Sequence, residues 1–178
     1  MMTDMERTQY QRKSILAVLK PVTGIVFLVV VDQILKLWAV SMLMGREPVV
    51  IIDGVLELRY LENSGAAFGM LQNATVFFII LTLAVIAFAA FVYLRTLLDD
   101  KFIFLHLTLI LLIGGAIGNF IDRILNTYVV DYIYFKLIDF PIFNFADICV
   151  TFAEIFLIIA LLFVYKEDDL KGIFKKSE

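Results

Sequence analysis

Long apolar runs are the feature that most limits how this chain of 178 residues can fold. Residues 74–94 and 102–121 contain no Asp, Glu, Lys or Arg, and residues 148–165 contain a single acid, Glu154. A fourth run, residues 15–38, carries Lys20 and Pro21 near its start. A helix needs about 20 mostly apolar residues to cross a bilayer. The sequence therefore predicts one all-α membrane domain over residues 1–178, a bundle of four transmembrane helices.

Composition agrees with a membrane protein and excludes several other classes. Hydrophobic residues make up 62% of the chain and charged residues 19%, and the mean hydropathy is +0.93. This is too apolar for a disordered chain or an ordinary soluble enzyme. A single cysteine excludes an internal disulfide framework. The net charge of −3 comes without a basic cluster, so no nucleic-acid partner is expected.

Positive charges predict how the helices are oriented, because cytoplasmic segments of membrane proteins are enriched in Lys and Arg. The two ends of the chain and the middle connection carry Arg7, Arg12, Lys13, Lys20, Arg95, Lys101, Lys166, Lys171, Lys175 and Lys176. The other side carries Lys36, Arg46, Arg59, Arg123 and Lys136. Both termini are therefore predicted to be cytoplasmic, with loops at about residues 44–73 and 122–147 facing outward.

The two outward loops have different patterns. Residues 49–61 contain β-branched residues around Asp53 and Gly54, followed by alternating apolar and charged side chains. This pattern is typical of a β-hairpin and predicts a small extracytoplasmic hairpin or cradle. Residues 128–135 and 141–143 are aromatic, and we expect this second loop to lie at the membrane interface.

Polar side chains gather at the predicted outer ends of the helices. With a rise of 1.5 Å per residue, Asp32 lies roughly 25 Å from Ile15, while His106 lies about 24 Å from Asp122 at the opposite end. The outer group comprises Asp32, Asn63, Asn119, Asp122, Arg123, Asp131 and Asp147. Ionisable groups close to hydrocarbon are costly and usually functional.

Each of these residues also has a simpler structural explanation. The pair Asp32 and Lys36 has the i, i+4 spacing of an ordinary ion pair on a helix surface. Asp147 is a possible N-cap of the last helix. The other structural alternatives are a solvated helix end for Asp122–Arg123, a turn for Asn144, and close-packing bends for residues 65–69 and 114–118.

The available side chains favour carboxylate chemistry. Cys149 lies near Asp147, but His106 is on the other side of the membrane, which disfavours a Cys–His nucleophile. No cluster offers the usual zinc ligands, so neither a metal nor another cofactor is expected. Two aspartates held close together share one proton, so that one acts as a base on water while the other donates to a carbonyl oxygen.

Five blocks occur in order along the chain. They are Asp32-Gln-Ile-Leu-Lys36, Asn63-Ser-Gly-Ala-Ala-Phe-Gly69, Gly114-Gly-Ala-Ile-Gly-Asn-Phe-Ile-Asp-Arg123, Val129-Val-Asp131 and Phe143-Asn-Phe-Ala-Asp147. With four predicted spans, the chain resembles lipoprotein signal peptidase (signal peptidase II), a family of bacterial membrane aspartyl proteases.

The resemblance implies that Asp131 and Asp147 form a catalytic pair. It implies substrate-binding or site-bracing roles for Asp32, Lys36, Asn63, Gly65, Asn119, Asp122, Arg123 and Asn144. The implied substrate is a prolipoprotein with a diacylglyceryl cysteine, cut just before that cysteine in the bacterial cell (inner) membrane, with the site near the outer face. Membrane lipid and globomycin-type inhibitors are the other implied partners.

Two other functions remain as alternatives at this stage. A small transporter or proton-pathway component would have acidic residues spaced through the bilayer. A non-catalytic scaffold would leave the Asp motifs unexplained. Glu154 matches no block. It lies seven residues after Asp147 on nearly the same helix face, which leaves two interpretations: a hydrogen-bonded acid inside the bundle, or a contribution to the field at the pair.

Overall fold

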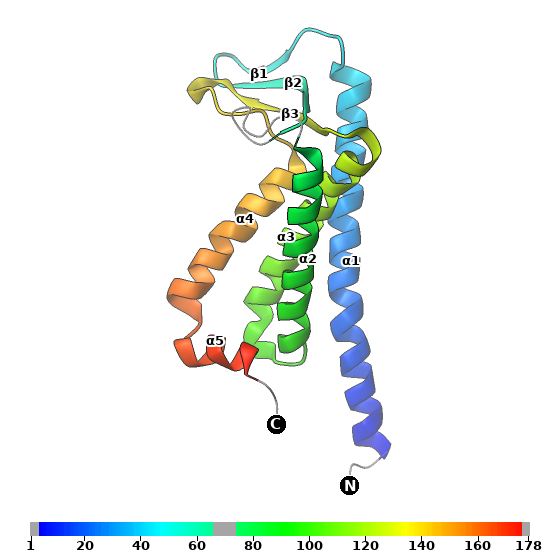
Figure 1. The fold of residues 1–178 in the computed structure, drawn as a ribbon, viewed down its shortest axis with the longest axis vertical. Coiled ribbons are helices and arrows are strands. Elements are labelled where there is room, and N and C mark those ends of the chain that lie inside the picture. The colour runs from blue at the N-terminus through cyan, green and yellow to red at the C-terminus, as the bar shows by residue number, and fades with distance from the viewer. Residues whose placement is uncertain (1–3, 66–73, 176–178) are drawn as a thin grey trace.

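Four long helices form a bundle with a small sheet over one end (Figure 1). The computed structural model describes the backbone of residues 4–65 and 74–175, and the side chains from residue 15 onward within those ranges. The helices are α1 (Asp4–Leu43), α2 (Thr75–Thr96), α3 (Ile103–Asn126), α4 (Phe145–Ile159) and the short α5 (Glu167–Phe174). A π-helical turn, Ala160–Val164, continues α4, and 3-10 turns lie at Asp100–Phe102 and Lys136–Ile138. Both chain ends lie at the end of the bundle away from the sheet.

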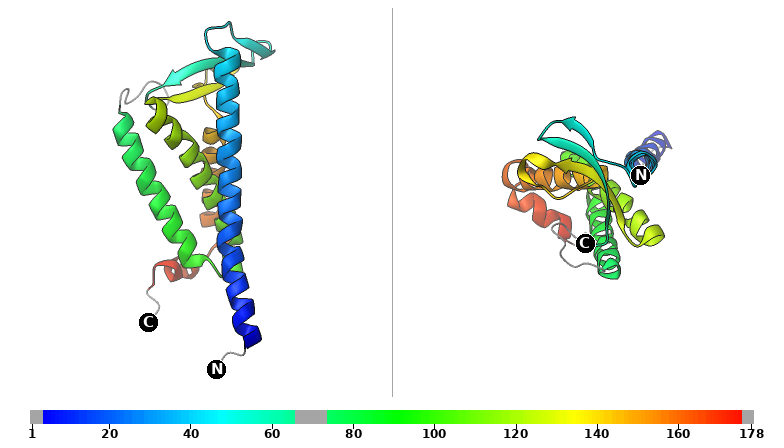
Figure 2. Two further views of the ribbon diagram at one scale, coloured as in Figure 1. Left: turned by 90° about the vertical axis from the view of Figure 1, so that its right-hand side faces the viewer. Right: turned by 90° about the horizontal axis from the view of Figure 1, so that it is seen from above.

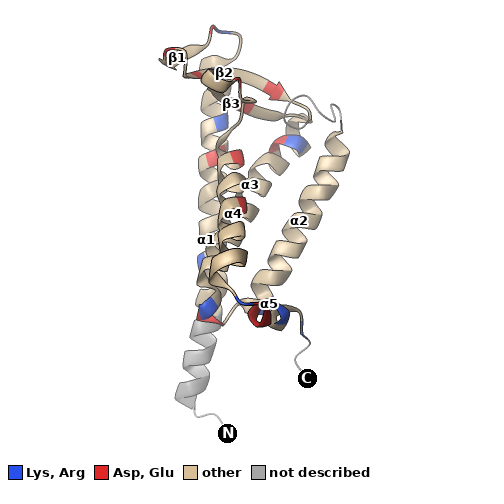
Figure 3. Ribbon diagram, turned by 90° about the vertical axis from the view of Figure 1, so that its left-hand side faces the viewer, with Lys and Arg blue, Asp and Glu red and all other residues tan. Residues whose placement is uncertain are grey.

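Four segments are long and apolar enough to cross a membrane. They are Ile15–Leu43, Thr75–Thr96, Asp100–Asn126 and Phe145–Val164. Their outward surfaces are apolar: Phe27, Leu162 and Phe163 are 65%, 67% and 80% exposed. Such a surface suits lipid rather than water, and most charged residues lie toward the two ends of the bundle (Figure 3). The predicted all-α membrane fold with four spanning helices is confirmed.

Helix α3 packs closely between α1 and α4 because it carries glycines where the backbones meet. A Cβ atom at Gly115 would lie 2.5 Å from the carbonyl oxygen of Ala146, and one at Gly118 would lie 2.5 Å from Oδ2 of Asp32. Small residues at such spacing let membrane helices approach each other. The close-packing explanation for residues 114–118 is therefore correct, and this packing brings polar groups of α1, α3 and α4 together.

The sheet contains the predicted hairpin and a strand that the sequence analysis did not predict. Strands β1 (Val49–Ile52) and β2 (Leu56–Asn63) are antiparallel and joined at Gly54, whose φ of +68° suits glycine. Strand β3 (Val129–Phe135) pairs with the other edge of β2. The aromatic second loop supplies this strand, and the sheet crosses the end of the bundle (Figure 2). Its position at the membrane interface stays a prediction.

The sheet is fixed to α1 by an apolar cluster. Ala39 and Leu43 of α1 pack with Val130 and Tyr132 of β3, and all four side chains are buried. The ring of Trp38 meets that of Tyr132 edge to face with centroids 6.5 Å apart. This contact holds β3, and with it Asp131, in a fixed position above the helix ends.

Candidate active site

A cavity of about 520 Å³ lies between the sheet, α3 and α4. Asp131 and Asp147 both line it, together with Asn63 and Arg123. Its other walls are mainly apolar and include Phe78, Phe140, Phe143, Ile148 and Phe152. Polar groups converging in a largely apolar cavity are typical of a ligand site.

Asp131 is placed by the register of the sheet. It lies opposite Leu61 in the β2–β3 pair, so Asn63, two residues along β2, is its diagonal neighbour on the same face. The amide Nδ2 of Asn63 donates to Oδ2 of Asp131 at 2.8 Å. The backbone N–H of Gly65 donates to Oδ1 of Asn63 at 3.0 Å and so fixes which way that amide faces. Asp131 itself is only 1% exposed.

Asp147 is held by the first turn of α4. Asn144, not Asp147, is the N-cap: its Oδ1 accepts from the backbone N–H of Asp147 at 3.0 Å. Oδ2 of Asp147 accepts from the backbone N–H of Asn144, also at 3.0 Å, which completes a capping box. Oδ1 of Asp147 accepts from Nδ2 of Asn119 on α3 at 2.8 Å. The N-cap explanation for Asp147 is therefore wrong by three residues.

A single buried amide joins the two aspartates. Nδ2 of Asn144 donates to Oδ1 of Asp131 at 2.6 Å, while Oδ1 of the same residue caps α4, the helix that carries Asp147 in its first turn. The same amide nitrogen donates to Oδ1 of Asn119 at 3.1 Å. Asn144 is 0% exposed and is therefore far from being a solvated turn residue. It fixes the strand-borne and helix-borne carboxyl groups relative to each other.

Burial and charge together shift the protonation of Asp131. Burial raises the pKa of this carboxyl, and the negative charge of Asp147 raises it further, to about 7. The hydrogen bonds from Asn63 and Asn144 oppose the rise because they favour the ionised form. A pKa near neutral pH is suited to a group that gives and takes a proton.

Below the pair, Lys36 is the centre of a buried ionic cluster. Its Nζ lies 2.9 Å from Oδ2 of Asp32, 3.2 Å from Oδ2 of Asp122 and 2.8 Å from Oδ1 of Asn119. The Lys36 and Asp32 side chains are 4% and 1% exposed. The interpretation of these two residues as a surface ion pair is therefore wrong. The close approach of α3 at Gly118 encloses them.

The acids of this cluster also bind the backbone around the site. Oδ1 of Asp32 accepts from the backbone N–H of Ala146 at 3.0 Å, and Oδ2 of Asp122 accepts from that of Val130 at 3.0 Å. Each donor, Ala146 or Val130, is one residue away from a member of the aspartate pair. Asp122 is 3% exposed, so the solvated-helix-end explanation does not hold for it. The cluster holds the start of α4 and strand β3 in place.

Gln33 is a bracing residue that the sequence analysis missed. Its Nε2 lies within hydrogen-bond distance of Oδ2 of Asp32 at 3.2 Å, Oδ1 of Asp122 at 3.1 Å and the carbonyl oxygen of Gly118 at 3.2 Å. The sequence contained an indication of this bracing role, because Gln33 is an uncharged polar residue between Asp32 and Lys36 within an apolar span.

Arg123 stands at the cavity without joining the ionic cluster. Its guanidinium carbon lies 4.9 Å from the centroid of the Phe78 ring on α2, and the residue lines the cavity with both aspartates. A guanidinium held over an aromatic face is oriented by that contact. Arg123 is thus placed to contact a ligand between α2 and α4.

Three singled-out residues lie outside this arrangement. His106 is hydrogen-bonded to Thr96 at the other end of the bundle, and Cys149 is a buried free thiol. Glu154 is exposed on α4, so its interpretation as a hydrogen-bonded acid inside the bundle is wrong. Residues 66–69 of the second block lie outside the described residues. Within the described ranges, no group of three or more His, Cys, Asp or Glu side chains is arranged to hold a metal ion.

The fold and the site define a class: a multi-pass membrane protein with an aspartate pair, one buried and one half-buried, where a strand and a helix meet at one end of the bundle. The sequence profile described as Signal peptidase (SPase) II matches residues 24–163. The chain belongs to the signal peptidase II family and is therefore a peptidase.

Named relatives and solved structures agree with this assignment. A lipoprotein signal peptidase of Streptococcus pyogenes serotype M5 (strain Manfredo) is 43% identical over 148 residues, covering 83% of this chain and 94% of the relative. One from serotype M18 (strain MGAS8232) gives the same values. A bacterial membrane enzyme structure obtained by the in meso method at 2.3 Å is 34% identical with a TM-score of 0.69, covering 89% of this chain and 94% of that one. A second, at 1.9 Å, is 35% identical with the same TM-score, covering 82% and 94%.

Proposed function

We propose that this peptidase removes the signal peptide from prolipoproteins whose cysteine carries diacylglycerol, cutting on the amino side of that cysteine. The observation that carries the proposal is the pair of carboxyl groups of the buried Asp131 and the half-buried Asp147, joined through Asn144 in a cavity at the end of a membrane bundle. The similarity to proteins named lipoprotein signal peptidase supports the substrate class.

In the proposed mechanism the pair carries one proton between its two carboxyl groups. Asp131, whose pKa is raised to about 7, holds this proton and donates it to the carbonyl oxygen of the scissile peptide bond. Asp147 acts as the base and removes a proton from the attacking water. The water oxygen bonds to the carbonyl carbon and forms a tetrahedral intermediate. Asp147 then passes its proton to the leaving nitrogen, the C–N bond breaks, and Asp131 takes back its proton from the hydroxyl group of the intermediate as the new carboxyl group forms.

The proposed topology puts both termini in the cytoplasm and the aspartate pair near the outer face of a bacterial inner membrane. The ten cations of the two ends and the middle connection support this orientation through the positive-inside rule. Lipid chains on the substrate would stay in the bilayer while the peptide bond reaches the carboxyl groups at the helix ends. The cavity between the sheet and α4 suits such a substrate.

A transporter or proton pathway is not favoured. That function predicts acids spaced through the bilayer. In the part of the chain that the structure describes, Asp32, Asp122 and Asp147 lie together at the sheet end of their helices, and Glu154 is the one acid near the middle of a span.

The experiment that tests the function uses purified protein in lipid vesicles with two forms of one prolipoprotein. The diacylglyceryl form should be cleaved before its cysteine, and mass spectrometry of the products should show the new N-terminus. The matched form with the cysteine replaced by serine, which carries no lipid, should remain intact. Globomycin should block the reaction. Equal cleavage of both forms, or cleavage at another bond, would contradict the proposed substrate.

The pH dependence of cleavage follows from Asp131. Because the pair works with one proton, activity should fall as the pH rises through about 7 and Asp131 ionises. Asn63→Ala removes a hydrogen bond that lowers this pKa, so the alkaline limb of the kcat/KM profile should move to higher pH. Asn126→Ala, at an exposed position at the end of α3, is the control and should leave the limb in place. An unmoved limb in Asn63→Ala would contradict the assignment of the proton.

The same pKa sets a stability trend. A carboxyl whose pKa is higher in the folded state than in the unfolded state binds its proton more tightly when folded. The protein therefore loses stability as the pH rises from the ordinary carboxyl range toward about 7.

A further inference from the structure

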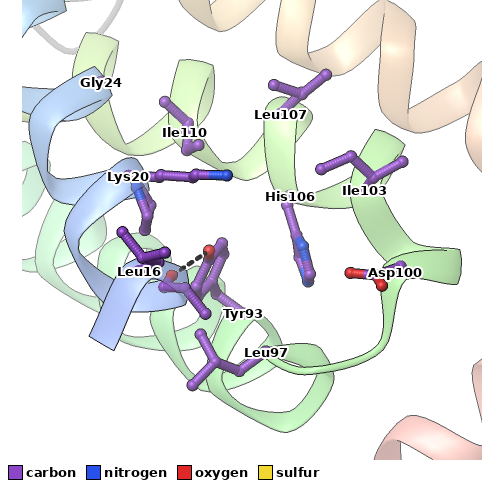
Figure 4. A pocket seen from close by; sticks show the side chains of 12 residues that line it. Leu16, Lys20, Gly24, Tyr93, Leu97, Asp100, Ile103, His106, Leu107 and Ile110 are labelled. Carbon is purple, nitrogen blue, oxygen red and sulfur yellow. Dashed lines mark hydrogen bonds between the residues drawn. The ribbon is translucent and has the colours of Figure 1, made fainter. Parts of the chain in front are cut away.

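A second cavity lies at the opposite end of the bundle from the aspartate pair. It has a volume of about 600 Å³ and is enclosed by α1, α2 and the start of α3. Its size is within the range of small-molecule sites, about 300–1,000 Å³. Figure 4 shows Lys20, Asp100 and His106 pointing into the space between these helices. The mechanism above uses none of these residues.

Lys20 is the cation of this cavity. It makes no hydrogen bond or ion pair with any residue that the structure describes, whereas Lys36, Lys101, Lys136 and Lys171 all lie within ion-pair distance of an acid. It is the sixth residue of the apolar run that follows Lys13 and Ser14 in the sequence, about 7.5 Å along the helix from Ile15 at 1.5 Å per residue. An ammonium group at this depth lies at the level of lipid headgroups or just below them.

The other polar groups of the cavity are largely occupied within the protein. The Tyr93 hydroxyl donates to the carbonyl oxygen of Ala17 at 2.8 Å. The Thr96 hydroxyl donates to the carbonyl oxygen of Val92 at 3.0 Å and lies 2.9 Å from Nε2 of His106. With the hydroxyl proton directed to the carbonyl, Nε2 of His106 is the donor of the second contact.

The walls around Lys20 are apolar and reach the lipid-facing surface. Leu16, Ile103 and Leu107 line the cavity and are 43%, 60% and 54% exposed. A shallower groove of about 480 Å³ on the outside of α1, bordered by Leu19 and Phe27, shares Lys20 and Gly24 with the cavity. A cation thus sits where an interhelical cavity meets an apolar surface groove.

We propose that this cavity is a binding site for a membrane phospholipid, with the phosphate on Lys20 and acyl chains along Gly24 and the groove of α1. Charge complementarity between an ammonium that has no acidic partner among the described residues and a phosphodiester selects this occupant. Gly24 keeps the passage open, because a Cβ atom there would lie 3.2 Å from Cγ2 of Ile110.

The test measures lipid binding by native mass spectrometry of the full chain released from detergent micelles. Phosphatidylethanolamine and phosphatidylglycerol should both remain bound, and diacylglycerol, which has no phosphate, should not compete. Lys20→Met should weaken phospholipid binding about 10-fold or more, the effect of losing one charge-assisted contact. Lys20→Arg should retain binding. Lys171→Met, at the same end of the molecule, is the matched control and should bind as the wild type does.

A second variant tests the cavity itself. Gly24→Leu fills the passage and should lower retention of both phospholipids while Lys20 is still present. Thermal unfolding of each variant checks that the bundle remains folded. Three results would overturn the proposal: undiminished phospholipid binding in Lys20→Met, equal binding of diacylglycerol, or loss of binding in the Lys171→Met control. All three readouts are independent of peptidase activity, so they stand apart from the function proposed above.

Discussion

Replacing either aspartate by asparagine should abolish cleavage: we expect kcat to fall about 10²–10⁴-fold or more in Asp131→Asn and in Asp147→Asn, the range lost with a general acid or base. The reason is that neither variant retains a pair of carboxyl groups that can hold one proton between them. Single-turnover cleavage of a diacylglyceryl prolipoprotein in vesicles measures the effect. The double variant should be no slower than the slower single variant, because the two groups act as a unit.

The hydrogen-bond geometry predicts how far these variants disturb the fold. Oxygen Oδ1 of Asp131 accepts from Asn144 and Oδ2 accepts from Asn63, and each donor is itself oriented by a backbone N–H. Asp131→Asn replaces one accepting oxygen by an NH₂ group that faces a donor, which costs about 1–3 kcal/mol. Because Asp131 holds the proton of the pair, the change to asparagine removes little charge. The variant should therefore fold, with an unfolding midpoint below that of the wild type by no more than this cost.

Glu154→Gln is the matched control for the aspartate variants. It makes the same change from carboxyl to amide on α4, seven residues from Asp147, at an exposed position that does not line the cavity. Its cleavage rate and pH profile should equal those of the wild type. A folded Asp131→Asn or Asp147→Asn protein with near-normal turnover would show that the catalytic pair is assigned to the wrong residues.

The spans and the hairpin could be predicted from the sequence because their causes are local. Uncharged runs of about 20 residues directly predict membrane helices, and Asp53-Gly54 between β-branched residues predicts a tight turn. Strand β3 could not be predicted this way. It is defined by pairing with β2, and its contact between Asn63 and Asp131 joins residues 68 positions apart.

Local sequence patterns also did not determine which polar side chains are buried. An i, i+4 pair such as Asp32 and Lys36 has the same sequence spacing whether it lies on a solvated helix surface or inside a bundle. The difference arises from α3, where Gly118 brings its backbone against Asp32, and from Asn119, which contributes an oxygen 83 positions away from Lys36. Glu154 shows the reverse case, since a single acid in an apolar run suggested an interior position and the side chain is exposed.

Replacing the buried cation Lys36 should have the largest effect on the free energy of unfolding. Lys36→Met should lower the free energy of unfolding by about 3–5 kcal/mol, because it leaves Asp32 and Asp122 buried without their counter-ion. It also removes the donor to Oδ1 of Asn119, the residue that positions Asp147. Cleavage should therefore fall along with stability.

Thermal unfolding in detergent micelles measures this effect through Trp38, the only tryptophan, which lies against Tyr132 beside the cluster. Lys171→Met is the control, since it breaks a pair with Glu167 whose side chains are 69% and 80% exposed, and it should cost at most about 1 kcal/mol. Adding Asp32→Asn to Lys36→Met should recover part of the lost stability, because one unpaired charge is removed. An unfolding midpoint of Lys36→Met equal to that of Lys171→Met would mean that the buried cluster does not hold the helix ends together.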